Sequence, residues 1–163
     1  MSPRGQVAVR PARPEDWLGV QALLRELDEL HAELVPAYFR PATRTEPDWR
    51  RLLGDSTALA LVAVDEGEGS RAPVGFLSLR VYDTPADPTM VPRRRGHLET
   101  LIVDARRRRS GIGGRLLAAA ADWARARGAA EMVLTTWVGN AEADAFYERL
   151  GYRVLSHVLH AKL

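Results

Sequence analysis

The segment 104–115 combines three glycines with five arginines, and this combination suits the binding of a phosphate group. Gly111, Gly113 and Gly114 carry no side chain, so the backbone there can approach a ligand closely and offer N–H groups that lack a partner. Such a turn attracts anions further when it opens a helix, because the helix dipole is positive at that end. The pattern predicts a pyrophosphate site, with a solvated turn and a basic rim as the alternative.

This turn differs from the two common nucleotide-binding loops. It lacks the Gly-Lys-Ser/Thr ending of a P-loop. A dinucleotide fold would place an acidic residue about 20 positions further on to hold a ribose, whereas Trp123 and Ala124 occupy that face here. A serine hydrolase is also poorly supported, because Ser110 belongs to the arginine turn and has no nucleophile-elbow pattern around it.

The turn lies between an expected strand at 97–103 and the strongest helix pattern of the chain, at 111–128. The helix repeats apolar residues at the spacing of one helical face and closes on Gly128, a common helix-ending residue. Period-two patterns, helix starts and turn residues predict the other elements. These are strands at 6–10, 57–64, 74–81, 131–138 and 152–159, helices at 14–35, 48–54 and 141–150, a turn at 65–73, and a long loop at 83–95.

This order predicts a single α/β domain over residues 1–163, with residues 1–5 as a flexible terminus. The unit made of strand 97–103, helix 111–128 and strand 131–138 has to cross over to a parallel neighbour. A chain of 163 residues with 46% hydrophobic and 27% charged residues is typical of one soluble globular domain. The sequence has no signal-peptide pattern, no cysteine and no apolar stretch long enough to span a membrane. We therefore expect a cytoplasmic protein without a membrane partner.

The net charge of +2 is unevenly distributed along the chain. Residues 15–68 carry twelve acidic residues against five arginines, whereas residues 93–115 carry eight arginines against two acidic residues. An anion is expected at the basic segment and a cationic partner at the acidic half. A nucleic-acid-binding module built on the basic segment is the competing class. The segment has no aromatic residue between Arg93 and Arg115 for stacking on bases, so we expect no nucleic acid.

Three segments resemble the GCN5-related N-acetyltransferase (GNAT) superfamily. The sequence Arg108-Arg109-Ser110-Gly111-Ile112-Gly113 matches that superfamily's acetyl-CoA signature, Arg/Gln-x-x-Gly-x-Gly/Ala. The preceding residues 98–104 resemble the strand that leads into the signature, and residues 139–141 and 145–152 resemble its second cofactor segment. The resemblance covers about residues 97–153. It implies a mixed central sheet that splays between strands 97–103 and 131–138, with helices on both faces.

The resemblance also implies where acetyl-CoA binds. The strand edge at Leu101, Ile102 and Val103 would pair with the pantetheine arm. Asn140 would bind this arm, cap the helix that follows, or do both. The pyrophosphate would lie at the glycine turn, where the implied contacts are Arg108, Arg109, Ser110, Gly111, Ile112, Gly113, Gly114 and Arg115.

Acetyl transfer to an amine needs a base for the amine proton and an acid for the departing thiolate. By resemblance, Glu99 is the base and Tyr147 the acid, with Tyr147 also next to the sulfur. Alternatives remain open: Glu99 as a partner of nearby arginines, and Tyr147 as a core ring. His97 is the second candidate for the base, because it lies two residues from Glu99 and therefore on the same strand face.

The amine acceptor is expected among the first two helices, their connector and loop 83–95. Candidate contacts are Glu33, Tyr38, Tyr82 and Trp137, with His31 and Asp83 nearby. The acidic half favours a polyamine, an aminoglycoside-like molecule or a protein amine. The histidines show no convincing metal-ligand spacing, so we assign no metal. A regulatory domain that binds acetyl-CoA without turnover is the alternative function, and relatives in the superfamily often form homodimers.

Overall fold

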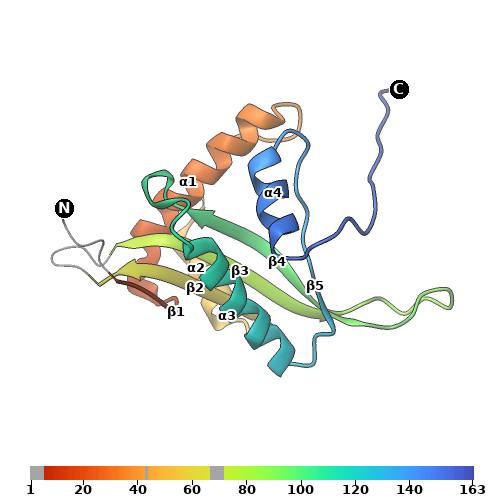
Figure 1. Cartoon of the computed structure of the whole chain (residues 1–163), viewed down its shortest axis with the longest axis horizontal. Helices are drawn as coiled ribbons and strands as arrows, with labels where there is room; N and C mark the ends of the chain where they lie inside the picture. The colour runs from red at the N-terminus through yellow and green to blue at the C-terminus, as the bar shows by residue number, and fades with distance from the viewer. Residues whose placement is uncertain (1–5, 43, 67–71) are drawn as a thin grey trace.

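The computed structural model describes residues 6–42, 44–66 and 72–163. A five-stranded mixed sheet forms its centre, in the order β1-β2-β3-β4-β5 (Figure 1). Its strands are β1 (Val7–Pro11), β2 (Ala58–Asp65), β3 (Pro73–Asp83), β4 (Arg94–Val103) and β5 (Glu131–Val133). Neighbouring strands from β1 to β4 are antiparallel, and β5 is parallel to β4. The mixed α/β fold expected from the sequence is therefore confirmed.

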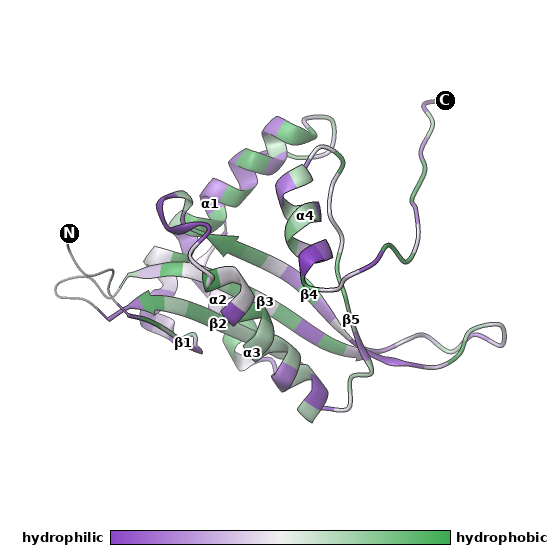
Figure 2. Cartoon of the chain, in the orientation of Figure 1, coloured by the Kyte–Doolittle hydropathy of each residue, from purple (hydrophilic) through white to green (hydrophobic). Residues whose placement is uncertain are grey.

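Helices cover both faces of the sheet. A 3-10 turn (Pro14–Asp16) leads into α1 (Trp17–Leu34), and α2 (Glu46–Gly54) packs beside it on one face. The other face is covered by α3 (Ile112–Ala126), which is preceded by a second 3-10 turn (Ala105–Arg107). The last helix is α4 (Ala141–Arg149). Figure 2 shows that β2 and β3 are largely apolar, as expected for strands buried on both faces.

Each face of the sheet has its own core because side chains alternate along a strand. On the α3 face, Leu77 and Leu79 of β3 pack against Ile112 and Leu116. On the α1/α2 face, Phe76 packs with Val20 and Trp49. The two cores fix α1 and α3 on opposite sides of β4, which is the strand that leads into the glycine turn.

The polar connection between β1 and α1 is held by a buried carboxylate. Arg10 donates two hydrogen bonds to Asp16, at 2.7 and 2.8 Å, and the backbone N–H of Arg13 donates a third at 2.7 Å. Burial alone would raise the pKa of Asp16, but the hydrogen bonds outweigh it and the pKa is lowered. Asp16 therefore stays ionised and fixes the entry of α1 on the sheet.

The structure corrects the expected strands near the C-terminus. Strand 131–138 is shortened to β5, because its pairing with β4 ends at Val133. The final strand expected at 152–159 is not formed, since this segment has no neighbouring strand to bond to. The long loop at 83–95 is shorter than expected, because β3 and β4 continue as a hairpin as far as Asp83 and Arg94.

Two expected features cannot be compared with the structure. The flexible terminus at 1–5 lies outside the described residues, and so does most of the turn at 65–73, namely residues 67–71. Within the described part of the chain, no helix combines the length and hydropathy needed to cross a bilayer.

Candidate functional site

The site is organised by an opening between β4 and β5. The two strands pair only at residues 95–97 and 131–133, after which the chain of β5 leaves the sheet. The edge of β4 from Leu98 to Val103 therefore has no strand on that side. Ile102 is buried in the α1/α2 core, and Leu101 and Val103 pack against the α3 core. Alternate residues of a strand paired on one side direct their backbone groups to the open side, so this edge can offer backbone groups to a ligand while the side chains hold the strand in place.

At the end of β4 the chain turns into α3 with a backbone suited to anion binding. Gly111 is the N-cap of α3 with φ +81°, a left-handed conformation that favours glycine. The first backbone bond of the helix runs from the Arg115 N–H to the Gly111 carbonyl, at 3.1 Å. Within the described residues, the N–H groups of Ile112, Gly113 and Gly114 have no partner. Three free donors thus sit at the positive end of the helix.

The three glycines serve different purposes. A Cβ atom on Gly111 or Gly114 would meet no atom within 4 Å. A Cβ on Gly113 would lie 3.3 Å from the Phe146 ring. Gly113 therefore lets α3 and α4 pack closely, Gly111 supplies the left-handed turn, and Gly114 leaves open space beside the free N–H groups.

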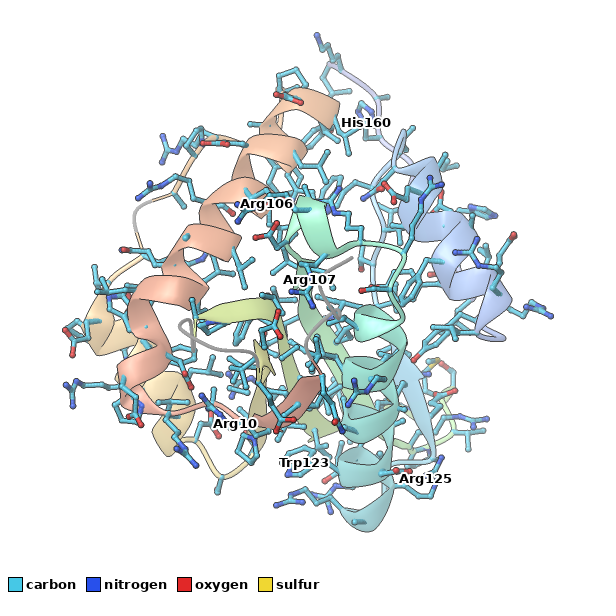
Figure 3. The ribbon with its side chains drawn as sticks, turned by 60° about the vertical axis from the view of Figure 1, so that its left-hand side comes forward. Arg10, Arg106, Arg107, Trp123, Arg125 and His160 are labelled. Carbon is cyan, nitrogen blue, oxygen red and sulfur yellow. The ribbon has the colours of Figure 1, made fainter. Side chains whose placement is uncertain are left out.

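Most arginines of the basic segment already have acidic partners. Arg106 binds Asp104, Arg107 binds Asp65 at the end of β2, and Arg108 binds Glu26 of α1. Arg108 also donates to the Val103 carbonyl at 3.2 Å, so it ties α1 to the end of β4. Figure 3 shows Arg106 and Arg107 on the turn between β4 and α3. The excess positive charge of the segment is thus largely neutralised.

Two arginines of the turn remain available to a ligand. Arg109, which has φ +57°, and Arg115 make no ion pair with any residue that the structure describes. Their contact with an anion stays a prediction, as does that of Arg108. The Ser110 hydroxyl donates to the Arg107 carbonyl, so the side chain stabilises the turn itself.

Glu99 lies in a β-bulge. The register of β3 and β4 shifts between Ser78, which faces Thr100, and Leu79, which faces Leu98, so Glu99 is the extra residue. A bulge turns a side chain out of the regular alternation of the strand. Glu99 points toward Arg80 on the α1/α2 face, opposite Leu98 as in a regular strand, and the alternation breaks after it, because Thr100 lies on that same face.

A charged network holds the Glu99 carboxylate. Arg80 donates from Nε to Oε1 of Glu99 at 3.2 Å and also binds Asp55, so the expected pairing of Glu99 with an arginine is observed. Hydrogen bonds from the Thr57 hydroxyl and backbone, together with the bond from Arg80, lower the pKa of Asp55 to about 2. Asp55 thus remains an anion and keeps Arg80 in place. In the described structure, Oε2 of Glu99 has no hydrogen-bond partner.

His97 lies on the same strand face as Glu99, as the sequence predicts. It faces Arg80 in the strand register, and Arg80 binds Glu99. The His97 ring is half-buried and lies 6.3 Å from the ring of Tyr82, edge on. Tyr82 is therefore placed beside His97 at the base of the β3–β4 hairpin.

Tyr147 is enclosed by aromatic rings on α4 and after it. Its ring centroid lies 5.1 Å from Phe146 and 5.5 Å from Tyr152. Burial raises the pKa of Tyr147 to about 12, with a smaller contribution from Tyr152. The hydroxyl therefore keeps its proton at neutral pH. The ring thus packs against the core, as one interpretation of the sequence expected, while the hydroxyl remains a proton donor.

Asn140 caps α4. Its side-chain oxygen accepts a hydrogen bond from the Ala143 N–H at 3.2 Å, so the capping role is observed. The amide nitrogen of the side chain is not used in this bond. A contact of that nitrogen with the pantetheine arm remains a prediction.

An aromatic cluster joins the connector after α1 to the chain that follows β5. Trp137 lies 5.8 Å from Tyr38 and 4.7 Å from Phe39, measured between ring centroids. His31 lies 4.8 Å from Phe39, and His160 lies 5.7 Å from Tyr38. The structure thus brings together Tyr38 and Trp137 from the predicted acceptor site. Glu33 is exposed at the end of α1, and Tyr82 is outside the cluster beside His97.

A pocket that the sequence did not predict lies between α1, α2 and the sheet. Its volume is about 190 Å³, and its floor includes Ser78 and Thr100, the residue next to Glu99. Trp17 and Trp49 line its walls, and the buried Nε1 of Trp49 has no partner among the described residues. The sequence carries no signal for this pocket, because its lining residues come from elements that are distant in the chain. No cluster of metal-binding side chains occurs within the described ranges.

Comparison with known proteins places this arrangement among acyltransferases. A model of the acetyltransferase (GNAT) family matches residues 23–152. A solved mutant of the BH1408 protein from Bacillus halodurans is 26% identical, with a TM-score of 0.89 over 96% of this chain and 99% of that chain. A search of curated proteins finds no match.

Two aminoglycoside acetyltransferases share the fold at lower identity. The aminoglycoside antibiotic 6'-N-acetyltransferase AAC(6')-Ih from Acinetobacter baumannii is 19% identical, with a TM-score of 0.72 over 97% of this chain and 98% of that chain. AAC(6')-Iy, solved with the bisubstrate analog CoA-S-monomethyl-acetylneamine, is 17% identical with the same TM-score and coverage. At these identities the likeness is one of fold.

Gly111 and Gly114 offer a matched test of the turn. Gly111→Ala should lower the free energy of unfolding by about 1–2 kcal/mol, because alanine is strained at φ +81°. Gly114→Ala should leave it unchanged or raise it by up to about 1 kcal/mol, because alanine favours a helix. Urea unfolding followed by circular dichroism measures both. Equal effects of the two substitutions would contradict the assigned turn.

Proposed function

The chain belongs to the GNAT family of acetyltransferases, and from this premise we propose that it transfers the acetyl group of acetyl-CoA to a primary amine. The observation that carries the proposal is the row of free N–H groups at the start of α3, beside the unpaired edge of β4. A pyrophosphate needs N–H donors and positive charge, and the pantetheine amides need a free strand edge. The chain offers both along one continuous segment.

The residues of the turn fit the cofactor in size as well as in charge. Ile112, Gly113 and Gly114 supply the N–H donors, and the open space at Gly114 leaves room for phosphate oxygens. Arg109 and Arg115 supply charge that no described partner neutralises. When bound, acetyl-CoA supplies the acetyl group as a reactive thioester. No metal is needed for this transfer.

Glu99 and Tyr147 supply the proton transfers. Oε2 of Glu99 accepts a proton from the amine, directly or through water, while Arg80 holds Oε1. The C–N bond of the new amide forms and the C–S bond breaks, and the Tyr147 hydroxyl returns a proton to the departing sulfur. Because burial raises the pKa of Tyr147 to about 12, that proton is present at neutral pH.

A cationic acceptor remains the best candidate, and it enters from the side of α1 and α2. The negative excess of this half is smaller than its composition suggests, since Glu26, Asp55 and Asp65 bind arginines from outside it. Glu29 and Glu33 are exposed without an ion-pair partner in the described structure. They and the cluster of Tyr38 and Trp137 suit a small molecule or peptide with a ring or aliphatic body and an amine.

The proposal is tested by thiol release from acetyl-CoA in the presence of polyamines, aminoglycosides, amino acids and peptides. We expect release with at least one cationic amine, together with a rise in thermal stability on adding acetyl-CoA alone. Stabilisation without release across the panel would instead support a regulatory binding domain. The absence of both effects would contradict the cofactor site.

Gly114→Val tests the cofactor turn. The added side chain should enter the open space beside the free N–H groups and weaken CoA binding more than tenfold. Ala118→Val, at an exposed position of α3, is the matched control and should bind CoA as wild type. Isothermal titration with CoA measures both. If Gly114→Val binds CoA as tightly as wild type, the proposal that the pyrophosphate binds at this turn is wrong.

Tyr147→Phe tests the proton donor. The substitution should lower kcat by about 100-fold and leave the affinity for CoA nearly unchanged, because only the hydroxyl is lost. Tyr152→Phe is the matched control, since Tyr152 is also partly buried and packs against Tyr147. Steady-state kinetics should show little change for this control. Full activity of Tyr147→Phe would exclude it as the acid.

Glu99→Gln tests the base. The rate should fall about 100-fold and most strongly at low pH, where more of the acceptor is an ammonium ion that has to lose a proton. Glu131→Gln, which removes an ion-paired carboxylate on the neighbouring strand, is the control. A loss that does not vary with pH would assign Glu99 a role in positioning the acceptor.

A further inference from the structure

The pocket between α1, α2 and the sheet lies beside the proposed base. Its floor includes Ser78 of β3 and Thr100 of β4, which face each other in the strand register. Arg80 follows Ser78 on the same side of β3, because side chains alternate along a strand, and it binds Glu99. Two residues of a strand span about 7 Å. The pocket floor and the Glu99 carboxylate are thus neighbours on one face of the sheet.

The walls of the pocket are apolar and held in place. Trp17, Trp49 and Phe76 line it, together with one leucine from each helix. The ring centroids of Trp17 and Trp49 are 6.1 Å apart, and those of Trp49 and Phe76 are 5.8 Å apart. Trp49 and Phe76 are almost fully buried in the α1/α2 core, which fixes both rings. Such walls favour a ligand group that is itself apolar, because binding removes its surface from water.

The size of the pocket limits that group to about one ring. An apolar cavity of about 150 Å³ binds benzene. The pocket, at about 190 Å³, therefore has room for one ring of that size with a small substituent. An acceptor built of several linked sugar rings would stay mostly outside it.

The charged residues along the pocket have partners of their own. Arg44 binds Asp28, donating from Nη2 at 2.8 Å, and Asp48 accepts a hydrogen bond from Arg51 at 2.9 Å. Among the described residues that line it, the pocket thus offers no free carboxylate to an ammonium group. An unpaired charge is costly to bury. The group that enters is therefore uncharged, and the amine of the acceptor stays outside, toward Glu99.

The polar groups of the floor, by contrast, lack partners. Ser78 is 4% exposed, and neither its hydroxyl nor that of Thr100 makes a hydrogen bond to a described residue. Buried polar groups normally have a hydrogen-bond partner. A hydroxyl can both donate and accept, so a hydroxyl, ether or carbonyl group on the ligand can bond to this floor. The ring that suits the pocket therefore carries a polar substituent.

We propose that this pocket binds the body of the acceptor, and that the acceptor is a small primary amine joined to one uncharged ring by a short chain. The ring packs against Trp17 and Trp49, and its polar substituent bonds to Ser78 or Thr100. The amine reaches Oε2 of Glu99, which a chain of about two carbons allows over the spacing of the strand. This inference rests on the proposed function, because it assigns the acceptor of that reaction.

The indole N–H signals in nuclear magnetic resonance spectra show where a ligand binds without any turnover. The chain has four tryptophans: Trp17 and Trp49 line the pocket, Trp123 packs on the α3 face, and Trp137 belongs to the aromatic cluster. Tyramine at millimolar concentration, added in the presence of CoA, should shift the signals of Trp17 and Trp49 and leave that of Trp123 unchanged. Shifts confined to Trp137, or an unchanged spectrum, would overturn the inference.

Two leucines of α2 offer a matched pair of variants. Leu52 lines the pocket, whereas Leu53 packs into the same core outside it. Leu52→Phe should fill the pocket and raise the Kd of tyramine about tenfold or more, and Leu53→Phe should leave it within about twofold of wild type. Isothermal titration measures the Kd, and circular dichroism confirms the fold. Wild-type affinity in a folded Leu52→Phe variant would overturn the inference.

A second variant, Ser78→Ala combined with Thr100→Val, removes both floor hydroxyls with little change in volume. It should weaken the binding of tyramine about fivefold, because the phenol loses its hydrogen bond. The binding of 2-phenylethylamine, which has no hydroxyl, should not change. Equal losses for the two amines, or no loss for either, would contradict the assigned contact.

Thiol release separates this inference from the proposed function. With acetyl-CoA, kcat/KM for tyramine should exceed that for spermidine and for kanamycin about tenfold or more, because the pocket holds no further ammonium group. A higher kcat/KM for spermidine or kanamycin would overturn the inference and leave the proposed function intact. Tyramine that shifts Trp17 and Trp49, without thiol release in the presence of any amine, would overturn the proposed function while the binding site stands.

Discussion

The structure depends on the place where β4 and β5 stop sharing hydrogen bonds. Three residue pairs at 95–97 and 131–133 hold the strands together, and the two chains then diverge. Buried side chains continue to hold β4 on both faces, so Ile102 and its neighbours stay in position without a strand on one side. The opening is therefore rigid at its β4 wall. Backbone groups of alternate residues on this edge face a ligand that can replace the missing strand.

β4 holds both the proposed cofactor turn and the proposed base in position. At one end of β4, Gly111 adopts a left-handed conformation and starts α3 with unpaired N–H groups. In the middle of the strand, Glu99 lies at a bulge and binds Arg80, and Asp55 fixes that arginine in turn. One strand thereby leads into the turn proposed to bind phosphate and carries an oriented carboxylate.

Acidic and basic side chains of this protein mainly form ion pairs with one another. The acidic excess of the first half and the basic excess of residues 93–115 meet in ion pairs that tie α1 and β2 to the glycine turn, as Arg108 with Glu26 and Arg107 with Asp65 illustrate. Among the described residues of the turn, the charges left for an anion are few and local, namely Arg109 and Arg115. Their small number favours a defined anion over an extended polyanion.

The sequence by itself determined the order of elements as far as α4, the glycine turn and the cap at Asn140, because each is encoded by neighbouring residues. Local spacing also set the α/β class and put His97 and Glu99 on one face. Only the tertiary structure decided which arginines are free, where the bulge falls and where β5 ends. Those features depend on partners distant in the chain, such as Arg80 for Glu99. The unpaired segment 152–159 shows the same limit: strand composition is local, whereas a strand exists only where another edge accepts it.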